Sequence, residues 1–462
     1  MTQPKLRFAP SPTGLLHPGN ARTAIINWLF AKSQNARLSL RVDDTDLTRS
    51  TKAFEDAIRQ DLNWLGIDFD DEVRQSERMH HYDDAARLLR KNGRLYPCFE
   101  SAEELELKRK IRLSRGHPPI YDREALTLTP EKIQSNIDKG LQPYWRFKLN
   151  PQKIIWHDLV RGQITIDPCH ISDPVLIRAD QRPLYSLSSV VDDGLMQITH
   201  VVRGEDHVTN TATQIQIFEA LSYPIPRFAH LPLIIDDSGA NLSKRSRSFA
   251  LSDLRAEGFE ASAVRAWLAM LGTARTLVGD EKASELIQSF DFANFGRASP
   301  RFNLDSLKEA SQHYFRNLDF DTIQTRLKTH AKPIPPEIIS MIDEHLWQCV
   351  RANITNPDEL IRWAQIIASY KPRPLSDKPR QIIDICLEEI PSQFDDGFLR
   401  IWMKKTIRLF ENKHKTKIKP KDFFGALRHA LTGLAHGPEL GPLLKCIGYD
   451  KVLKRLQKAS GQ

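Results

Sequence analysis

Cysteine is scarce in this chain, and long hydrophobic runs are absent. The 462 residues include an odd number of cysteines that stand singly and form no Cys-x-x-Cys pair: Cys98, Cys169, Cys349, Cys386 and Cys446. Such spacing does not fit a disulfide framework and favours reduced thiols with structural roles. No run approaches the roughly eighteen apolar residues that a membrane-spanning helix needs, so we expect no membrane role.

The first residues lack the basic head and apolar stretch of a secretory signal. Met1 to Lys5 leads directly into a strand-like run, so we expect a cytoplasmic protein. A composition of 40% hydrophobic and 27% charged residues is typical of a soluble globular chain. At roughly one domain per 150 residues, this length predicts about three domains.

Acidic residues are few at one end of the chain. Residues 401–462 contain fourteen lysines and arginines against four acids, a net charge of +10, whereas the whole chain carries +8. A basic segment of this kind fits a polyanionic partner such as a nucleic acid. It fits equally well a solvated face that keeps a protein soluble.

The N-terminal region is predicted to form a βαβ unit. Lys5 to Ala9 and Leu38 to Val42 read as strands, and apolar residues recur between them at helical spacing. Pro18-Gly19-Asn20 stands where the helix should begin. Backbone N–H groups at such a helix start point outward and bind phosphates.

The middle of the chain interrupts this alternation and then returns to it. Ser76 to Arg115 is predicted to be helical and Tyr144 to Ile177 to form short strands, as in an inserted α+β module. From Tyr185 the alternation resumes, with strands predicted at Leu195 to Val202 and Leu231 to Ile235.

Beyond Phe249 the strand signals fade, and the C-terminal half is predicted to be mainly α-helical. Helices are expected at Ala261 to Leu271, Pro336 to Val350, Pro357 to Ser369 and Phe423 to Leu434.

The segment from Arg7 to Arg22 joins a strand end, a loop rich in Pro and Gly, and a helix start. Within it, His17-Pro18-Gly19-Asn20 resembles the HIGH signature of class I aminoacyl-tRNA synthetases. The preceding Arg-Phe-Ala-Pro-Ser-Pro-Thr-Gly resembles their glutamyl and glutaminyl branch. Gly19 would let a nucleotide approach the backbone, and His17 would donate a hydrogen bond to phosphate as charge develops.

A second motif, Asn241-Leu242-Ser243-Lys244-Arg245, follows a predicted strand and resembles the KMSKS signature of the same class. The resemblance implies a loop in which Lys244, with Arg245 beside it, neutralises the leaving pyrophosphate. Asn241 departs from the pattern, because the family usually has a first lysine there. The loop is therefore one positive charge short.

The stretch between the motifs carries the most specific resemblance to glutamyl-tRNA synthetases. It includes Ser172 to Arg178, Val190-Val191-Asp192-Asp193 and Thr199 to His207. The resemblance implies a glutamate site made by residues at strand ends: Arg7, Ala9, Ser11, Asp43, Tyr185 and Arg203. It implies an ATP site made by His17, Gly19, Asn20, Ser243 and Lys244, with His17, Gly19, Asn20, Lys244 and Arg245 as the catalytic set.

Arg203 is our candidate for the residue that selects glutamate. A buried arginine that binds a carboxylate in two places rejects glutamine, whose amide would set donors against donors. Two positions depart from the family. Asp43 stands where Glu is usual, so the contact with the substrate ammonium needs a longer reach or a water, and Ser189 stands where Asn is frequent. Asp43 to Asp46 would also suit a turn and helix cap.

The implied architecture is multidomain, α/β followed by all-α. Residues 1–80 and 185–248 would form the halves of a split Rossmann-type catalytic domain, and 81–184 an inserted α+β module that binds the acceptor stem. Residues 249–320 would form a helical stem-contact domain. Residues 321–462 would form the helical anticodon-binding domain, with basic side chains on tRNA phosphates.

The resemblance implies ATP as a substrate with Mg²⁺, and tRNA(Glu) as partner of an expected monomer. It implies no zinc, because Cys98-Phe99-Glu100 replaces a Cys-x-Cys pair and Tyr121 to Leu126 offers no Cys or His. Alternatives remain open: an enzyme that also or only charges tRNA(Gln), a relative that modifies an anticodon base, and an inactive tRNA-binding protein.

Overall fold

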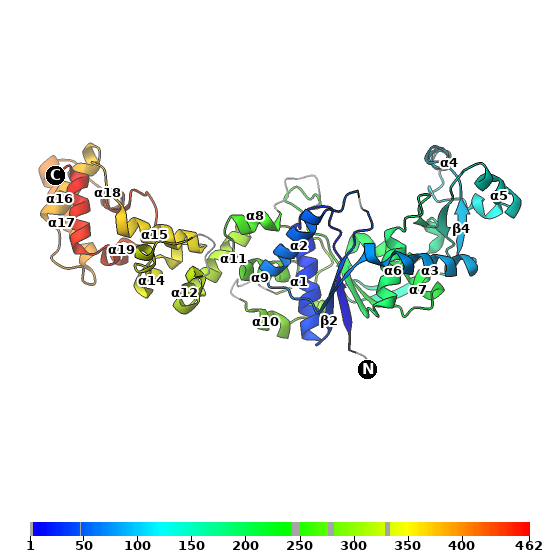
Figure 1. Ribbon diagram of the computed structural model, residues 1–462. Coiled ribbons are helices and arrows are strands. Elements are labelled where there is room, and N and C mark those ends of the chain that lie inside the picture. Colours follow the sequence, from blue (N-terminus) through cyan, green and yellow to red (C-terminus); the bar gives the residue numbers. More distant parts are fainter. Residues whose placement is uncertain (1–2, 47, 243–249, 276–280, 329–332) are drawn as a thin grey trace. The chain divides into compact units, whose positions relative to one another are not determined.

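The computed structural model describes residues 3–46, 48–242, 250–275, 281–328 and 333–462 (Figure 1). The described chain forms two compact units. The first takes in most of the chain up to residue 304, and the second takes in 257–263 and 305–462. No helix within the described residues is both long and apolar enough to cross a membrane.

The first unit is built on a mixed sheet with strand order β3-β2-β1-β9-β10-β6-β7. Neighbouring strands run parallel except β6 and β7, which are antiparallel. The strands are β1 (Lys5–Phe8), β2 (Arg37–Val42), β3 (Asp71–Arg74), β6 (Ile154–Asp158), β7 (Gly162–Ile166), β9 (His200–Gly204) and β10 (Arg227–Leu231).

Helices pack on this sheet because its central strands are buried on both faces. Five of the six residues of β2 are buried. The helices of this part are α1 (Pro18–Ser33), α2 (Lys52–Trp64), α3 (Met79–Lys91), α6 (Tyr185–Leu195), α7 (Val208–Ala220), α8 (Leu251–Ala256), α9 (Ala261–Met270) and α10 (Ala283–Gln288).

A smaller antiparallel sheet has the order β4-β5-β8. It lies with two helices within residues 81–184, and α4 begins with a capping box in which Ser101 and Glu104 bond each other's backbone. These elements are β4 (Leu95–Cys98), α4 (Ala102–Ser114), α5 (Pro130–Asp138), β5 (Tyr144–Phe147) and β8 (Val175–Ile177). The same segment also contributes β6 and β7 to the large sheet, so it is joined to the large sheet through two strands.

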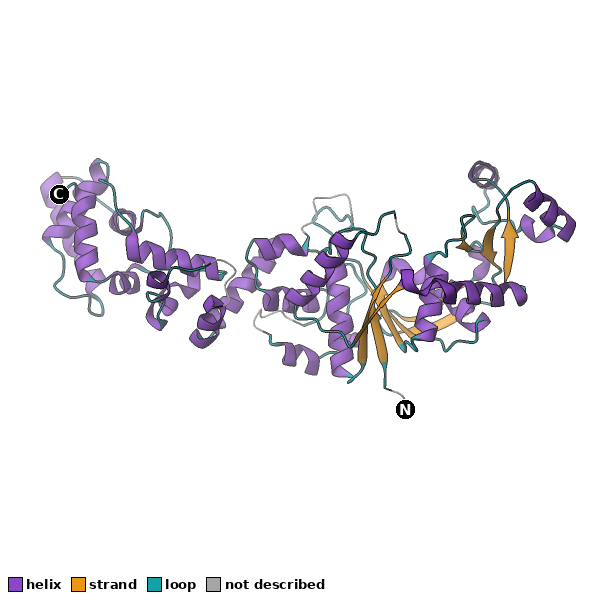
Figure 2. Ribbon diagram, in the orientation of Figure 1, coloured by secondary structure: helices purple, strands orange, loops and turns teal. Residues whose placement is uncertain are grey.

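The second unit is helical, and Figure 2 shows residues 305–462 as helices joined by loops. Its core surrounds fully buried Trp347, Trp402 and Phe423, the last two in edge-on contact at 5.9 Å. The helices are α11 (Leu304–Asn317), α12 (Phe320–Lys328), α13 (Pro336–Ile339), α14 (Glu344–Val350), α15 (Pro357–Ser369), α16 (Asp377–Glu388), α17 (Phe398–His414), α18 (Pro420–Thr432), α19 (Leu440–Ile447) and α20 (Tyr449–Ser460).

Several predicted elements are wrong in extent. The strand predicted at Leu231 to Ile235 is instead β10, which ends where Pro232 offers no N–H to a ladder. The strand predicted from Leu195 begins at His200, because α6 continues to Leu195. The helix predicted over Pro336 to Val350 is two helices, since Asp343 caps the second by accepting from Leu346 N.

The helical prediction for Ser76 to Arg115 also misses a strand. Leu95 to Cys98 forms β4 between α3 and α4 and pairs with β5. Four residues are too short for a periodic pattern to distinguish a strand from a helix.

Candidate active site

Charged side chains gather where β1, β2 and β9 end. These strands are neighbours and parallel, so their carboxyl ends share one edge of the sheet. Arg7, Arg41 and Arg203 are all nearly or fully buried there. Three buried arginines at one edge need acceptors, and their partners define the site.

The guanidinium of Arg203 donates hydrogen bonds to neutral groups through all three of its nitrogens. Its Nη1 donates to the Tyr185 hydroxyl at 3.0 Å, so the phenolic oxygen acts as an acceptor and its own O–H points elsewhere. Its Nε lies 3.2 Å from His230 Nε2. Its Nη2 donates to Thr211 Oγ1 and Gln214 Oε1, both at 2.7 Å. Burial lowers the pKa of Arg203, yet an arginine keeps its charge at neutral pH.

Arg7 and Asp43 are linked through two residues that the sequence did not single out. Arg7 Nε donates to Asp193 Oδ1 at 3.0 Å, and Arg41 Nη1 donates to the same oxygen at 2.6 Å. Arg41 also donates to both carboxylate oxygens of Asp43, at 2.7 and 3.2 Å, and to Ser189 Oγ at 3.3 Å. The four charges form one buried chain.

The two carboxylates in this chain have different pKa shifts. Burial alone would raise the pKa of Asp193, but Arg7 and Arg41 outweigh it and hold that pKa below the ordinary value. Burial raises the pKa of Asp43 despite its bonds to Arg41. A buried carboxylate of this kind is stabilised in its charged form by a cation brought against it.

Ala9 and Ser11 lie in the loop that leaves β1. Pro10 O accepts from Asp43 N at 3.0 Å, which ties this loop to the end of β2. Ala9 is half-buried and Ser11 is exposed. The structure therefore brings the two loop positions beside Asp43, as the strand order requires.

The start of α1 differs in one respect from expectation. We expected its first N–H groups to be unpaired, but Gly19 N and Asn20 N donate to His17 Nδ1 at 3.1 and 3.4 Å. His17 is thus the helix cap, and its neutral ring carries the proton on Nε2. A Cβ on Gly19 would lie 2.9 Å from the His17 ring, so glycine is needed for this cap.

The second motif is only partly described. Ile235 pairs with Asn241 in an isolated antiparallel bridge, and Asp236 Oδ1 accepts from Ser238 N and Ala240 N in the turn between them. Asn241 is exposed and Leu242 is buried. Ser243, Lys244 and Arg245 lie outside the described residues.

The residues near Cys98 do not fit a zinc site. The Cys98 thiol is buried and lies 3.7 Å from the Tyr121 hydroxyl, which donates to Glu100 at 2.6 Å. Burial raises the pKa of Cys98 to about 12, so the thiolate that zinc requires is disfavoured. Hydrogen bonds connect these three side chains instead.

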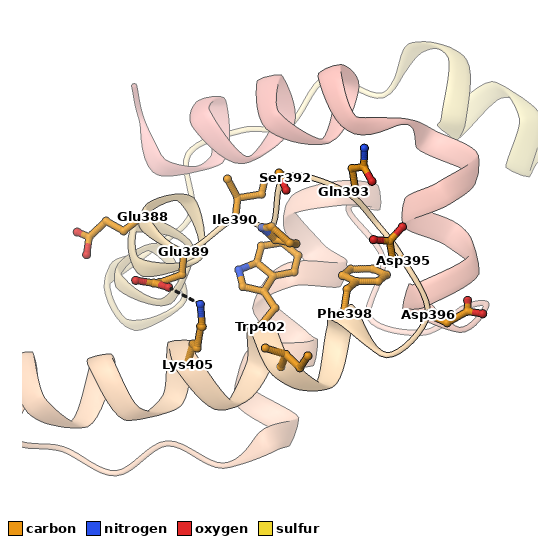
Figure 3. Close-up of a pocket in the computed structure, with 12 residues that line it drawn as sticks. Glu388, Glu389, Ile390, Ser392, Gln393, Asp395, Asp396, Phe398, Trp402 and Lys405 are labelled. Carbon is orange, nitrogen blue, oxygen red and sulfur yellow. Dashed lines mark ion pairs between the residues drawn. The ribbon is translucent and has the colours of Figure 1, made fainter.

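A cavity of about 590 Å³ lies in the second unit, apart from all predicted site residues (Figure 3). Trp402 and Phe398 line it, and Lys405 forms an ion pair with Glu389 at 3.6 Å. Its acidic lining residues are Glu388, Glu389, Asp395 and Asp396. This excess of negative charge does not suit a phosphate group.

The sequence missed Arg41, Asp193 and His230 as site residues. Arg41 was detectable, because it interrupts the apolar run of a strand that should be buried on both faces. His230 gave no such signal, and Asp193 stood only within a stretch that resembles the family, because the partners of both residues come from elements distant in sequence.

Family comparison agrees with this geometry. The family described as "tRNA synthetases class I (E and Q), catalytic domain" matches residues 4–309, and "Anticodon binding domain" matches residues 403–460. With its mostly parallel sheet and its motif at the start of α1, the chain is a class I aminoacyl-tRNA synthetase.

Full-length relatives narrow this assignment. "Glutamate--tRNA ligase 2" of Hyphomonas neptunium is 44% identical and covers 99% of this chain and 100% of its own. "Glutamate--tRNA ligase 1" of Bartonella quintana is 41% identical over 98% of each. The chain therefore belongs to the glutamyl-tRNA synthetase family.

Solved structures share its fold. A glutamate tRNA ligase from Elizabethkingia meningosepticum, in complex with its amino acid, has a TM-score of 0.79 and 25% identity over 100% of this chain and 99% of its own. A glutamate-tRNA synthetase from Elizabethkingia anophelis has a TM-score of 0.78 and 24% identity over all of both chains.

Proposed function

We propose that this chain attaches L-glutamate to tRNA in two steps. The glutamate α-carboxylate attacks the α-phosphorus of ATP, forming glutamyl adenylate and releasing pyrophosphate. The 2′-hydroxyl of the terminal adenosine then attacks the activated carbonyl, releasing AMP. The observation that carries this proposal is the buried pair Arg7 and Arg203, with Tyr185 bonded to Arg203, at the edge of the sheet that continues into α1.

Arg203 and Tyr185 would hold the side chain of glutamate. Because the Tyr185 oxygen accepts from Arg203, its O–H donates to the substrate carboxylate beside the second N–H of Nη1. Arg7 adds positive charge nearby. Glutamine would turn an NH₂ group toward these donors and leave them unpaired. The hydrogen bonds that favour glutamate would then be lost, and glutamine would bind more weakly.

The substrate ammonium would bind Asp43. Each Asp43 oxygen receives one bond from Arg41 and keeps a lone pair for a further donor. Arg41 thereby fixes a carboxylate that is one methylene shorter than the family's usual glutamate. Ala9 and Ser11, in the loop tied to Asp43, would contact the α-amino and α-carboxylate end.

His17, Gly19 and Asn20 would bind the phosphates of ATP. The backbone N–H groups of Gly19 and Asn20 donate to His17 Nδ1 and so fix the position of the ring. The Nε2–H of His17 would then donate to a phosphate oxygen. Ser243, Lys244 and Arg245 would supply the positive charge and donors that stabilise the departing pyrophosphate. Mg²⁺ would enter with ATP, bound to its phosphates.

The tRNA would contact residues 81–184 at its acceptor end, 249–320 along its stem and 321–462 at its anticodon. In α17 and the loop after it, Lys404, Arg408, Lys415, Lys417 and Lys419 are exposed. Such residues bind phosphates with an affinity that falls as salt rises. We propose tRNA(Glu) as the substrate of a cytoplasmic monomer, with tRNA(Gln) as the second candidate.

Replacing Lys244 by Ala tests the assignment of the chemistry. Loss of one donor to developing charge should slow ATP–pyrophosphate exchange, measured with tRNA present, by roughly 10²- to 10³-fold. The tRNA affinity should stay within about twofold, because the stabilisation is specific to the transition state. Lys91→Ala, at an exposed site in α3, is the matched control. Exchange at the control rate would refute the role of Lys244.

A further inference from the structure

Three adjacent strands place a second layer of residues behind Arg203. Arg203 lies in β9, His230 in β10 and Asp158 at the end of β6, and the strands pair in that order. Arg203 and His230 are register partners. Asp158 and His230 are fully inaccessible to solvent, so their polar atoms depend on one another.

Both ring nitrogens of His230 have partners that determine where its proton lies. Nδ1 is 2.5 Å from Asp158 Oδ2, and an ionised carboxylate can only accept, so Nδ1 carries the proton. Nε2 is 3.2 Å from Arg203 Nε, which always carries a proton, so Nε2 must be the acceptor in that contact. Nε2 also lies 2.9 Å from Thr211 Oγ1, but the Thr211 hydroxyl donates to His207 O at 3.1 Å and leaves the lone pair to Arg203. The two contacts require the same neutral tautomer.

The charges around the ring support this neutral form. Burial lowers the pKa of His230, and the adjacent Arg203 lowers it further, against the raising effect of Asp158. Burial is the largest influence and would raise the pKa of Asp158, but His230 and the backbone N–H donors together outweigh it and keep that pKa below its ordinary value. A neutral histidine therefore stands between a carboxylate and a guanidinium.

The other oxygen of Asp158 prevents the carboxylate from turning. Oδ1 accepts from three backbone N–H groups, those of Val160 and Arg161 at 3.0 Å and of His230 at 3.1 Å. Oδ2 is thereby fixed toward the imidazole. The orientation is set by backbone that does not depend on a substrate.

We propose that Asp158 and His230 are positioning residues for amino-acid recognition: Asp158 keeps the His230 proton on Nδ1, and the Nε2 lone pair then orients Arg203 toward the substrate side chain. Nε is held by His230, and Nη2 by Thr211 and Gln214. One N–H of Nη1 binds Tyr185, and the other remains for the carboxylate of glutamate. This inference rests on the proposed function, which assigns Arg203 to that carboxylate.

Asp158→Asn should reverse the tautomer. The three backbone donors will retain the amide oxygen, so the NH₂ group will face His230 Nδ1, which must then accept. The ring proton moves to Nε2 and opposes the N–H of Arg203. We expect the KM for glutamate to rise roughly 10- to 100-fold, as for loss of a hydrogen bond to a charged group, while the KM for ATP stays within about twofold.

Asp167→Asn is the matched control. Asp167 also accepts from a backbone N–H two residues ahead, at 3.0 Å, but lies near the surface and does not touch His230. The variant should keep the wild-type KM for glutamate. The double variant Asp158→Asn/His230→Gln should recover most of the loss, because a glutamine oxygen accepts from Arg203 without any ring proton.

Nitrogen-15 NMR of histidine-labelled full-length protein reads the tautomer directly. The His230 signals are identified by their loss in His230→Gln, and the wild type should show the proton on Nδ1. A wild-type proton on Nε2 would overturn the inference even if no variant folds. So would a folded Asp158→Asn protein with an unchanged KM for glutamate, or with KM values for glutamate and ATP that rise together.

Measuring glutamate binding by Arg203→Met distinguishes a failure of this inference from a failure of the proposed function on which it rests. If that variant binds glutamate normally, the proposed function fails and the inference fails with it. If Arg203→Met impairs glutamate binding while Asp158→Asn does not, the inference alone fails.

Discussion

Arg41 binds two carboxylates at once, and its planar guanidinium is suited to this. It donates through Nε and Nη2 to Asp43 and through Nη1 to Asp193, with no exposed surface. Burial alone would lower the pKa of Arg41, but the carboxylates around it raise that pKa well above its ordinary value. A lysine ammonium offers no such fork.

Arg41→Lys should therefore separate Asp43 from Asp193. We expect the KM for glutamate to rise roughly 10- to 100-fold, because the ammonium contact is displaced, and the free energy of unfolding to fall by about 1 to 3 kcal/mol. ATP–pyrophosphate exchange and urea denaturation measure the two effects.

Arg37→Lys is the control for this substitution, since it lies in the same strand but pairs with Asp71 at the surface. It should change neither quantity measurably. A folded Arg41→Lys protein with the KM of the control would contradict the role given to Arg41.

At this scale the resemblance predicted Arg7, Tyr185 and Arg203 as glutamate-binding residues, and their roles stay predictions; the structure places the Tyr185 hydroxyl 3.0 Å from Arg203 Nη1. The sequence could not identify His230, because the partner of Arg203 depends on strand register between β9 and β10. Register is fixed by packing over the whole sheet, and spacing within one strand does not reveal it.

A buried aspartate, Asp61, lies where α2 contacts α8, and both its burial and its position in the helix disfavour its charged form. Asp61 lies in the C-terminal half of α2, where the helix dipole disfavours negative charge. It forms an ion pair with Arg255 of α8 at 3.2 Å, and burial raises the pKa of Asp61 from 3.8 to about 6. The folded state thus binds this proton more tightly than the unfolded chain does.

Stability should consequently fall as pH rises from about 4 to about 6, where the unfolded chain has lost a proton that the folded state retains. Asp61→Asn removes this cost and should stabilise the protein by about 1 to 3 kcal/mol at pH 7.5. The gain should vanish near pH 4. Urea denaturation at both pH values measures it.

Asp56→Asn, on the exposed face of the same helix beside Lys52, should show no such pH-dependent gain. An equal difference between Asp61→Asn and wild type at both pH values would count against the assignment.

Some helices and strands begin or end at residues that cap a helix or lack a backbone N–H. The helix predicted over Pro357 to Ser369 is confirmed as α15, which Asn356 caps by accepting from Glu359 N. The strand β10 was displaced in the prediction because an apolar run extends past Pro232, and hydropathy does not register the missing N–H.

The whole chain combines two units of different chemistry. The first contains the sheet whose edge gathers Arg7, Asp43 and Arg203, and the second is helical with a basic C-terminal segment. The full-length match to glutamate-tRNA ligases extends over both. The fading of strand signals beyond Phe249 predicted a helical C-terminal half, but it does not mark this division, because residues 281–304 belong to the first unit.

Charging of purified tRNA(Glu) with glutamate and with glutamine tests the central claim most directly, with tRNA(Gln) assayed beside it. We predict transfer of glutamate to tRNA(Glu), with kcat/KM for glutamine lower by on the order of 10⁴-fold, because the amide leaves the donors of Arg203 and Tyr185 unpaired. Glutamine transferred at a comparable rate, or no charging by a folded protein, would contradict this account.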